Sequence, residues 1–319
     1  MTRPTRFHQR RRLLQGALGT ATLAALPPVG AGRKSILPPL PDDTILRTIP
    51  ATGEQVPISG MGTARTFDVD PNDVAAMVQR QDVLRAFVDN GGRVVDSSPM
   101  YGRAETVLGR AAAAIDAPDA LFTATKVWTR GVEAGKAQMR ESAERLQTAT
   151  IDLMQVHNLL DLETHLDTLR AWKKEGRIRY LGVTHYTVAQ HATLAELVAR
   201  EPLDFVQFNY NIAERNAEIR LLEACADNGV AVLVNEPFER GKLFARVRNK
   251  PLPGVGEDLA CESWAQLFLK YIFGHPAVTV AIPATSDREH AAENARAGRG
   301  ALPDEAQRKA MRTAFEAAG

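Results

Sequence analysis

The sequence predicts a single α/β domain, a closed (β/α)8 TIM barrel, and three observations favour this fold class. Eight short apolar runs alternate with longer segments in which apolar residues recur at intervals of three and four. No Ser- or Pro-rich linker interrupts this alternation. The main alternative, an open doubly wound sheet, usually carries a Gly-rich turn after its first strand, and the chain has no G-x-G-x-x-G motif. Eight strand and helix units in one domain therefore suit a closed barrel.

The expected strands are runs of consecutive apolar residues, because parallel strands in a barrel are buried on both faces. They cover residues 57–61, 93–96, 121–125, 152–156, 180–183, 205–208, 230–234 and 278–282. Segments with helical periodicity lie between them, at residues 74–89, 133–146, 162–174, 189–199, 217–227 and 263–273. Residues 44–58, at the N-terminus of the domain, predict a β-hairpin that turns at Thr52-Gly53. This hairpin is expected to close the bottom of the barrel. Residues 303–318 predict an extra C-terminal amphipathic helix.

The first 31 residues differ in character from the rest of the chain. They contain no acidic residue, and a short apolar run rich in Gly and Ala, followed by two prolines, comes after a group of arginines: Arg3, Arg6, Arg10, Arg11 and Arg12. This order of basic, apolar and small residues is typical of an export signal. Residues 10–15, Arg-Arg-Arg-Leu-Leu-Gln, resemble the twin-arginine export motif of bacteria.

This leader predicts export to the periplasm, with the twin-arginine export machinery as a partner. We expect residues 1–31 to be a cleavable twin-arginine signal peptide, residues 32–43 a linker and residues 44–319 the barrel. A disordered basic leader and a membrane anchor are the alternatives. No stable membrane insertion is expected, because a spanning helix needs about 20 strongly apolar residues.

The composition is that of an ordinary globular protein and disfavours two function classes. The 319 residues are 45% hydrophobic and 24% charged, with a formal net charge of +1, so we expect no nucleic-acid partner. Cleavage after Ala31 would remove five arginines and no acidic residue and would leave a formal charge of −4. The seven histidines and two cysteines show no His-x-x-x-His or Cys-x-x-Cys spacing, so no metal site is expected.

Four ionisable residues follow the ends of three consecutive expected strands. Asp96, Lys126 and His157 each close a strand, and Tyr101 lies five residues after Asp96. Each residue alone has an ordinary explanation: a helix cap, a solvated lysine, a hydrogen-bonded core histidine or a tyrosine at the rim. Functional residues of (β/α)8 barrels project from the C-terminal ends of the strands. The four together therefore predict a catalytic site at one end of the barrel.

The chemistry of these residue types suits proton transfer by a phenol. A phenol has a pKa of about 10, which is high for a group that must give and retake a proton near neutrality. A neighbouring ammonium such as Lys126 is expected to lower the pKa of Tyr101, and the Asp96 carboxylate would keep that ammonium charged and oriented. His157 on the next strand could hydrogen-bond the same substrate oxygen.

Further motifs occur in a fixed order along the chain and together resemble the aldo-keto reductase family. They are Gly60-Met-Gly-Thr63; Gly91-Gly-Arg-Val-Val-Asp-Ser-Ser-Pro-Met-Tyr-Gly102 followed by Glu105 and Leu108-Gly109; Thr125-Lys126; Ile151-Asp-Leu-Met-Gln-Val-His157; Gly176-Arg-Ile-Arg-Tyr-Leu-Gly-Val-Thr184; Val206-Gln-Phe-Asn-Tyr210; Ile282-Pro-Ala-Thr-Ser286; and Glu293-Asn294.

The resemblance implies a catalytic tetrad of Asp96, Tyr101, Lys126 and His157, with Tyr101 as general acid and base. It implies an oxidoreductase that transfers a hydride between a nicotinamide cofactor and a small-molecule carbonyl, an aldehyde or ketone, or the corresponding alcohol. An exported noncatalytic barrel that binds a ligand or a partner protein is the alternative.

The resemblance also assigns positions to the cofactor. Gly62 and Thr63 match a stretch near the nicotinamide ribose, and Thr184, His185 and Gln207 match positions that face the carboxamide. The backbone after Pro283, with Thr285, Ser286 and a helix N-terminus at Asp287, is expected to form a phosphate cradle. The remaining cofactor-binding candidates are Asn235, Pro237, Phe238, Arg288, His290 and Asn294.

Two departures from the family pattern bear on the cofactor. The chain has Val234-Asn235-Glu236-Pro237 where many members have Ala-Tyr-Ser-Pro, so stacking of an aromatic ring on the nicotinamide is lost from that position. A lysine and an arginine often found in NADPH-specific members correspond to Ala284 and His290, which leaves Arg288 as the nearby fixed cation. We therefore expect NADPH to be the cofactor with only a modest preference, and NADH to be possible.

Substrate specificity in this fold comes from the loops that follow the strands. The candidates are Trp128, Asn158, Tyr186 and the insertion at residues 238–258. The alternative for Trp128 is a packing role, and the alternative for the insertion is a solvated loop without substrate contact.

Overall fold

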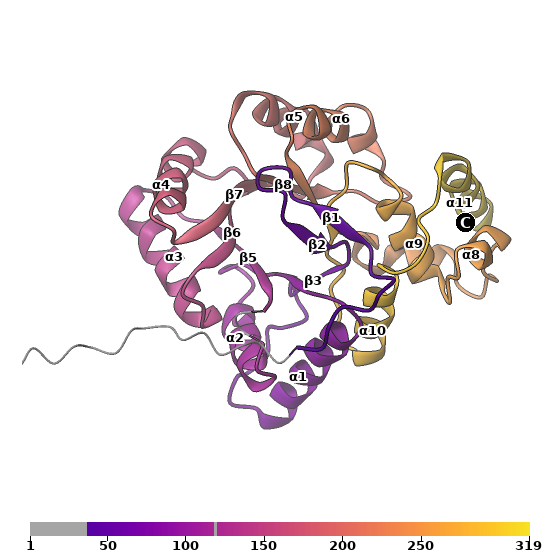
Figure 1. Ribbon diagram of the computed structural model, residues 1–319, viewed down its shortest axis with the longest axis horizontal. Helices are drawn as coiled ribbons and strands as arrows, with labels where there is room; N and C mark the ends of the chain where they lie inside the picture. The colour runs from indigo at the N-terminus through magenta and orange to yellow at the C-terminus, as the bar shows by residue number, and fades with distance from the viewer. Residues whose placement is uncertain (1–36, 118–119) are drawn as a thin grey trace, which may run out of the picture. The chain divides into compact units, whose positions relative to one another are not determined.

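The computed structural model describes residues 37–117 and 120–319. Within them, eight parallel strands form one sheet in the order β3 to β10, and helices surround it (Figure 1). The strands are β3 Gly60–Gly62, β4 Val94–Asp96, β5 Phe122–Val127, β6 Ile151–His157, β7 Ile178–Thr184, β8 Phe205–Asn209, β9 Ala231–Asn235 and β10 Val280–Ala281. The predicted (β/α)8 barrel is confirmed. The predicted signal peptide, residues 1–31, and the first part of the predicted linker lie outside the described residues.

The barrel closes where β3 meets the segment around β10. Bridges join Ser59 to Ala281 and Gly62 to Ala284, and the Gly62 amide donates to the Pro283 carbonyl at 3.0 Å. A Cβ atom at position 62 would lie 2.9 Å from the Ile282 carbonyl oxygen, so this closure requires glycine. The first expected strand, residues 57–61, is therefore shifted. Its first residue pairs in the hairpin, Ser59 forms the first bridge of the barrel, and β3 itself begins at Gly60.

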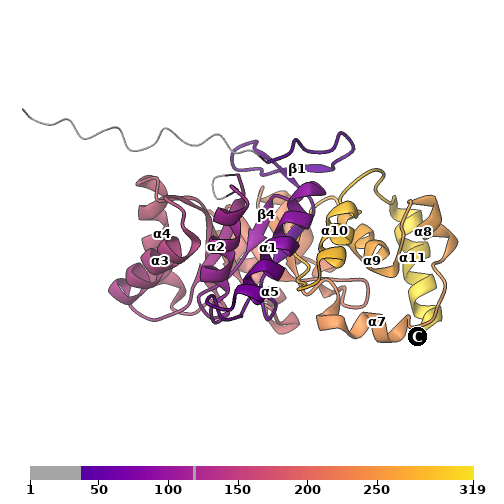
Figure 2. The same cartoon turned by 90° about the horizontal axis from the view of Figure 1, so that it is seen from below.

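The predicted hairpin is present as β1, Leu46–Thr48, and β2, Gln55–Pro57, which pair antiparallel. Figure 2 shows it at one end of the barrel, with helix α7 at the opposite end. Ile49 and Val56 pack on inward-facing residues of the barrel strands, among them Phe122 and Tyr180. The hairpin thus fills the N-terminal end of the barrel and leaves the C-terminal ends of the strands for function.

Helices cover the outside of the sheet, as the periodicity predicts. They are α1 Val74–Asp89, α2 Ala104–Ala114, α3 Val132–Leu146, α4 Leu162–Lys174, α5 His191–Arg200, α6 Leu221–Asp227, α9 Trp264–Phe273 and α10 Arg288–Arg296. Helix α2 is not predicted from the sequence, because Ala and Gly supply much of its buried face and give only a weak apolar periodicity. Among the described helices, none has both the length and the apolar character needed to cross a membrane.

Three segments differ from the helices expected along the sequence. Residues 189–199 begin as a 3-10 turn, Val188–Gln190, before α5, and residues 217–227 contain a second turn, Asn216–Glu218, before α6. The insertion after β9 is not an irregular loop: it contains a 3-10 turn, Glu239–Gly241, and the short helices α7, Lys242–Arg246, and α8, Gly254–Asp258.

The predicted C-terminal helix is α11, Glu305–Ala318, and it docks through a buried polar cluster. The Arg308 guanidinium donates to Glu218 at 2.8 Å and to the Tyr210 hydroxyl at 2.6 Å. The Tyr271 hydroxyl also donates to Glu218, at 2.9 Å. The Tyr210 hydroxyl donates to the same carboxylate. Three hydrogen bonds thus share Glu218 and fix α11 against the barrel helices.

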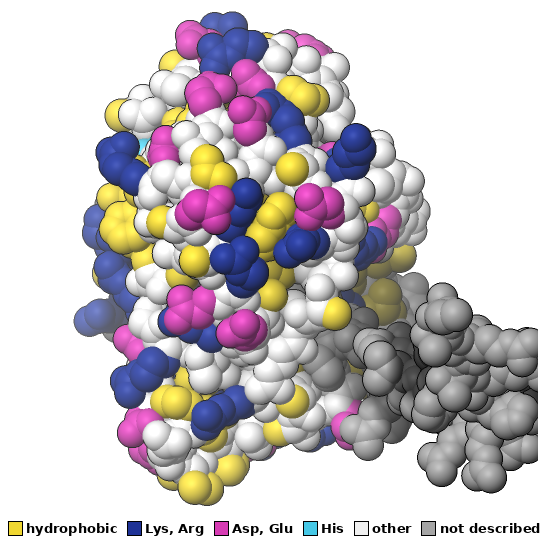
Figure 3. Space-filling model, turned by 90° about the vertical axis from the view of Figure 1, so that its left-hand side faces the viewer, with side chains coloured by type: hydrophobic (Ala, Val, Ile, Leu, Met, Phe, Trp, Pro, Cys, Tyr) yellow, Lys and Arg dark blue, Asp and Glu magenta, His cyan; other side chains and the backbone are white. Residues whose placement is uncertain are grey.

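The face over α3 and α4 carries basic and acidic side chains that alternate with small apolar areas (Figure 3). Several of these charges pair within one helix, for example Arg170 with Asp167 at 2.9 Å on α4. This mixture is what the near-neutral composition predicts for such a face.

Candidate active site

A buried ion pair joins the ends of β4 and β5. Lys126 lies two positions beyond the β5 residue that pairs with Asp96, so both side chains reach the C-terminal end of the barrel. The Lys126 ammonium donates to the two Asp96 carboxylate oxygens at 2.8 and 2.7 Å and to the Ser97 carbonyl at 2.6 Å. The two side chains are only 1% and 3% exposed. Burial by itself would lower the pKa of Lys126, but the Asp96 charge and Tyr101 outweigh burial and raise it, so the amine stays an ammonium.

Tyr101 lies in the loop after β4, and its ring packs against the ammonium. The Lys126 Nζ atom is 5.1 Å from the ring centroid. Lys126 acts to lower the pKa of Tyr101, as expected, but burial outweighs it and the pKa is raised above its ordinary value. The expected effect of Lys126 is therefore present, but burial penalises the phenolate more than the ammonium stabilises it. The hydroxyl is thus a proton donor in this state.

His157 ends β6 and lies beside Tyr101, with ring centroids 6.1 Å apart in an edge-on arrangement. Its Nδ1 is 3.2 Å from the Ser98 hydroxyl. Burial, Lys126 and His185 lower the pKa of His157 to about 3. The imidazole is therefore neutral near pH 7. The structure brings all four residues of the predicted tetrad together at the strand ends.

Two imidazoles with lowered pKa values, the buried His157 and the half-buried His275, predict a loss of stability in mild acid. Burial is the main cause that lowers the pKa of His275 to about 4. In the unfolded chain, a histidine takes up a proton below a pH of about 6.5, whereas these two histidines stay neutral in the folded protein. Proton uptake therefore favours the unfolded state, so the free energy of unfolding is highest above that pH and falls as the pH drops toward 4. Each contributes a loss of up to about 2 kcal/mol at a pH of about 5.

Urea unfolding at a pH of about 7.5 and at a pH of about 5 measures this loss. Between these two pH values, we expect the free energy of unfolding to fall less in His275→Gln than in the wild type. His290→Gln, at an exposed histidine on α10, is the matched control. Equal losses in the wild type and His275→Gln would contradict the assignment of the acid sensitivity to His275.

Four amide side chains around the cluster have buried oxygens without a hydrogen-bond partner within the described part of the chain. They are Gln155 Oε1 on β6, Asn158 Oδ1 just after β6, Gln207 Oε1 on β8 and Asn235 Oδ1 at the end of β9. Buried acceptors without partners are costly, and at one end of a barrel they indicate a ligand that donates hydrogen bonds. A carboxamide such as that of nicotinamide has the NH2 group that fits them. Thr184 and His185, at the end of β7, lie between two of these strands.

Two other predicted cofactor residues use their side chains within the protein. The Thr63 hydroxyl is fully buried and donates to the Asp96 carbonyl at 3.0 Å, so it ties β3 to the end of β4. The Phe238 ring packs against Phe244 and Phe268, with centroids 5.0 and 6.5 Å away. Pro237, which precedes Phe238, is buried.

The predicted phosphate cradle has its helix start at the expected place, but Asp287 already occupies it. The Asp287 carboxylate accepts from the amides of Glu289 and His290 at 2.8 and 3.0 Å, and its own amide donates to the Thr285 hydroxyl. Arg288 is 67% exposed and pairs with Glu289 at 3.2 Å. The aspartate therefore caps the helix itself, and the amides of Glu289 and His290 are engaged within the protein.

Three further positions of this segment contribute mainly backbone groups. The Ser286 carbonyl accepts from Gln79 at 3.3 Å, and the Asn294 carbonyl accepts from Ser59 at 2.8 Å. The Pro283 carbonyl takes part in barrel closure.

Aromatic residues border the cluster at the ends of β5 and β7. The Trp128 ring is 6.4 Å from the His157 ring, and the Tyr186 ring stacks on His185 at 5.6 Å. The insertion reaches the same place, because Arg240 lies 5.7 Å above the Tyr186 ring and donates to Glu236 at 2.8 Å. Trp128, Tyr186 and the insertion thus lie beside the cluster or beside the residues next to it.

Two residues of the site were missed at the sequence level, Ser98 and Gln155. Ser98 contacts His157, and Gln155 Nε2 donates to Asp96 at 3.4 Å. Gln155 lies two positions before His157 on β6, so strand alternation places both on the same face. That alternation was a usable indication for Gln155.

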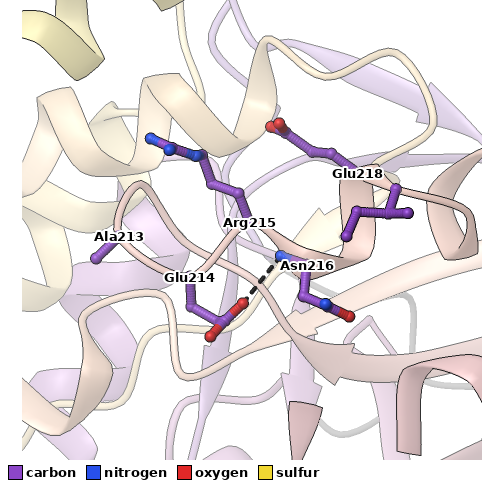
Figure 4. Close-up of a pocket in the computed structure, with 6 residues that line it drawn as sticks. Ala213, Glu214, Arg215, Asn216 and Glu218 are labelled. Atoms are coloured by element: carbon purple, nitrogen blue, oxygen red, sulfur yellow. Dashed lines mark hydrogen bonds between the residues drawn. The ribbon is translucent and has the colours of Figure 1, made fainter. Parts of the chain in front are cut away.

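Two hollows lie away from these residues. One of about 500 Å³ follows β8 and is bordered by residues 213–216, Glu218 and Ile219 (Figure 4). Its polar groups are already engaged: Glu214 accepts from the Asn216 amide at 2.9 Å, the dashed line in Figure 4, and Arg215 pairs with Glu316 at 3.1 Å. The other, of about 590 Å³, lies beside the hairpin and α6. We assign the functional site to the strand ends, where the buried ionisable cluster and the unpartnered amide oxygens lie together.

Comparisons with known proteins agree with this geometry. The model of the aldo/keto reductase family matches residues 60–312. Among curated relatives, aldo-keto reductase YhdN of Bacillus subtilis is 30% identical over 56% of this chain, but the match spans only 57% of that protein. Glyoxal reductase of Bacillus subtilis is 28% identical over 76% of this chain and 83% of its own.

A solved structure, an aldo/keto reductase from Klebsiella pneumoniae in complex with NADP and acetate, superimposes with a TM-score of 0.68. It is 26% identical in sequence, and the match covers 82% of this chain and 93% of that one. The barrel fold and the oxidoreductase class predicted from the sequence are confirmed. The chain belongs to the aldo/keto reductase family.

Proposed function

We propose that the protein uses a nicotinamide cofactor to reduce a small aldehyde or ketone, or to run the reverse oxidation of an alcohol. The observation that carries this proposal is the cluster in which a phenol, a buried ammonium, a carboxylate and a neutral imidazole meet at the strand ends. When bound, the nicotinamide supplies or accepts the hydride at the carbonyl carbon. The chain's own residues manage the proton.

In the reductive direction, the Tyr101 hydroxyl donates its proton to the carbonyl oxygen, which becomes the alcohol. Lys126, whose Nζ lies 5.1 Å from the phenol ring, stabilises the phenolate that remains. Asp96 holds the ammonium in place through two short hydrogen bonds. Water from the open side of the site returns the proton to Tyr101 after the product leaves.

The residues around the cluster fit the carboxamide of such a cofactor. Its NH2 group has two hydrogens and would donate to two of the unpartnered oxygens, among those of Gln207, Asn235 and Asn158. The related Klebsiella pneumoniae structure contains NADP, which supports the proposal for this chain. NADPH is the proposed cofactor, with NADH as a weaker ligand.

Arg288→Ala should bring the affinities for NADPH and NADH closer together. Arg288 is exposed and, among the residues that the structure describes, pairs with its neighbour Glu289, so its guanidinium is free to turn toward a 2′-phosphate. An exposed charge pair contributes about 1 kcal/mol or less, so we expect the ratio of the two dissociation constants to change by less than about tenfold. Fluorescence titration of both reduced cofactors into the cofactor-free protein measures the ratio.

The matched control is Arg296→Ala, which removes an exposed arginine at the other end of the same helix. An unchanged ratio in Arg288→Ala, or a wild-type preference for NADPH of several orders of magnitude, would show that another residue contacts the 2′ position.

A noncatalytic barrel that binds a ligand or partner is the second candidate function. Denaturing the protein after purification from its native compartment, and recording the absorbance and mass of the released small molecules, separates the two. A stoichiometric nicotinamide nucleotide supports the reductase. No nucleotide, with no turnover of any aldehyde or ketone when cofactor is added, supports the binding protein.

We also propose that residues 1–31 are a twin-arginine signal peptide, residues 32–43 a linker and residues 44–319 the exported barrel. Support comes from the arginines, the apolar run and the prolines of the leader. Twin-arginine transport carries folded proteins, so a cofactor bound before export could stay with the protein in the periplasm.

Replacing Arg10 and Arg11 together with lysine should retain the full-length protein in the cytoplasm. The paired guanidinium groups, rather than the positive charge, are the feature that the export motif supplies. Cell fractionation and the size of the product measure the outcome. A processed form outside the inner membrane would contradict use of this route, and the wild-type leader expressed in parallel is the control.

A further inference from the structure

Consecutive residues after β4 hold two different members of the catalytic cluster. Asp96 and the Ser97 carbonyl bind Lys126, and the next residue, Ser98, contacts His157. We propose that Ser98 is a positioning residue that holds His157 in the neutral tautomer with its proton on Nε2. The inference rests on the proposed function in one respect: the tautomer matters because His157 would face the substrate carbonyl.

The hydrogen bonds of Ser98 set the direction of its contact with His157. Ser98 is fully buried, and its oxygen already accepts from the Met100 amide at 3.3 Å. Among the described residues, the other hydrogen-bond partner of that oxygen is His157 Nδ1, at 3.2 Å. A buried hydroxyl proton without an acceptor is costly, so Ser98 donates and Nδ1 accepts. A neutral imidazole carries one N–H, which then belongs on Nε2.

Packing around the His157 ring does not determine which of its two nitrogens carries the proton. The rings of Tyr101 and Trp128 flank His157 at 6.1 and 6.4 Å and restrict its plane. In the described part of the chain, neither side chain forms a hydrogen bond with a His157 nitrogen. Ser98 is the contact, within the part of the chain that the structure describes, that tells the two nitrogens apart.

The tautomer decides what His157 presents to a substrate. Nε2 has no hydrogen-bond partner inside the described protein, so a proton on it is available to a ligand. An N–H donated to the carbonyl oxygen, beside the Tyr101 hydroxyl, orients the substrate and stabilises the charge that develops on oxygen. The other tautomer would turn a lone pair toward that oxygen and repel it.

The direct test is the tautomer itself, read from the 15N chemical shifts of the imidazole in the protein labelled at histidine. His157→Gln assigns the signal. We expect an acceptor-type shift for Nδ1 and a protonated-type shift for Nε2 in the wild type, and a move of both toward averaged values in Ser98→Ala. Ser97→Ala, which removes an equally buried hydroxyl one residue away, should leave the His157 shifts unchanged.

The kinetic test measures what the tautomer does for the reaction. Ser98→Ala should lower kcat for a carbonyl substrate by at least about tenfold, as expected for weakening one donor to the developing oxyanion, with the cofactor dissociation constant unchanged. Ser98→Thr keeps the hydroxyl and should restore the His157 shifts and most of kcat.

The outcomes separate the two proposals. A wild-type proton on Nδ1, or unchanged His157 shifts in Ser98→Ala, overturns the role of Ser98 whatever the protein catalyses. If Ser98→Ala alters the His157 shifts but keeps the wild-type kcat, Ser98 is not important for the reaction. Absence of turnover from the wild type with any carbonyl removes the proposed reductase function, while the shifts still decide the tautomer.

Discussion

Tyr101→Phe should abolish turnover, by a factor of at least about a hundred, while the affinity for the nicotinamide cofactor stays nearly the same. The substitution removes only the hydroxyl, which supplies the proton to the carbonyl oxygen. The ring, which packs on Lys126 at 5.1 Å, remains. Turnover and cofactor binding measured on one preparation give both numbers, so loss of the proton donor is distinguished from loss of the binding site.

The control is the same substitution at the other end of the barrel. The Tyr180 hydroxyl contacts Thr52 of the hairpin at 2.6 Å, far along the strand from the cluster. Tyr180→Phe should keep most of the turnover even where it costs some stability. Near-wild-type activity in Tyr101→Phe would remove Tyr101 from the mechanism and return the noncatalytic alternative to first place.

Asp96→Ala should destabilise the protein by about 3–5 kcal/mol, because it leaves the Lys126 ammonium buried without its counter-charge. Lys126 is 1% exposed and would keep only the Ser97 carbonyl as a strong partner. Burial would then lower the pKa of Lys126, and the phenolate of Tyr101 would lose its stabilising charge. Urea unfolding near pH 7 measures the stability, and turnover of the folded fraction measures the second effect.

Two comparisons make this result specific. Asp68 pairs with Arg103 at 3.2 Å on the surface, where both side chains are about half exposed, so Asp68→Ala should cost less than about 1 kcal/mol. The double variant Asp96→Ala with Lys126→Met should be less destabilised than the sum of its single variants, because it also removes the unpaired charge. Simple additivity would show that the two charges are not coupled.

The sequence by itself determined the barrel and the place of the cluster. Apolar runs that alternate with helical segments require parallel strands, and parallel strands in a barrel all end on one face. Asp96, Lys126 and His157 close neighbouring strands and Tyr101 follows the first of them, so spacing alone brings them to one rim. The hairpin at residues 44–58 was also predictable from the sequence, because its turn residues and short apolar runs are local features.

Only the tertiary structure decided how these groups behave. Burial by residues remote in sequence raises the pKa of Tyr101 against the pull of Lys126. Thr63 turns inward to Asp96, and Asp287 caps the helix that was expected to hold phosphate. The Ser98 contact with His157 joins positions 59 residues apart. Desolvation and hydrogen-bond partners depend on which atoms meet in space, and local sequence patterns carry no information about those distances.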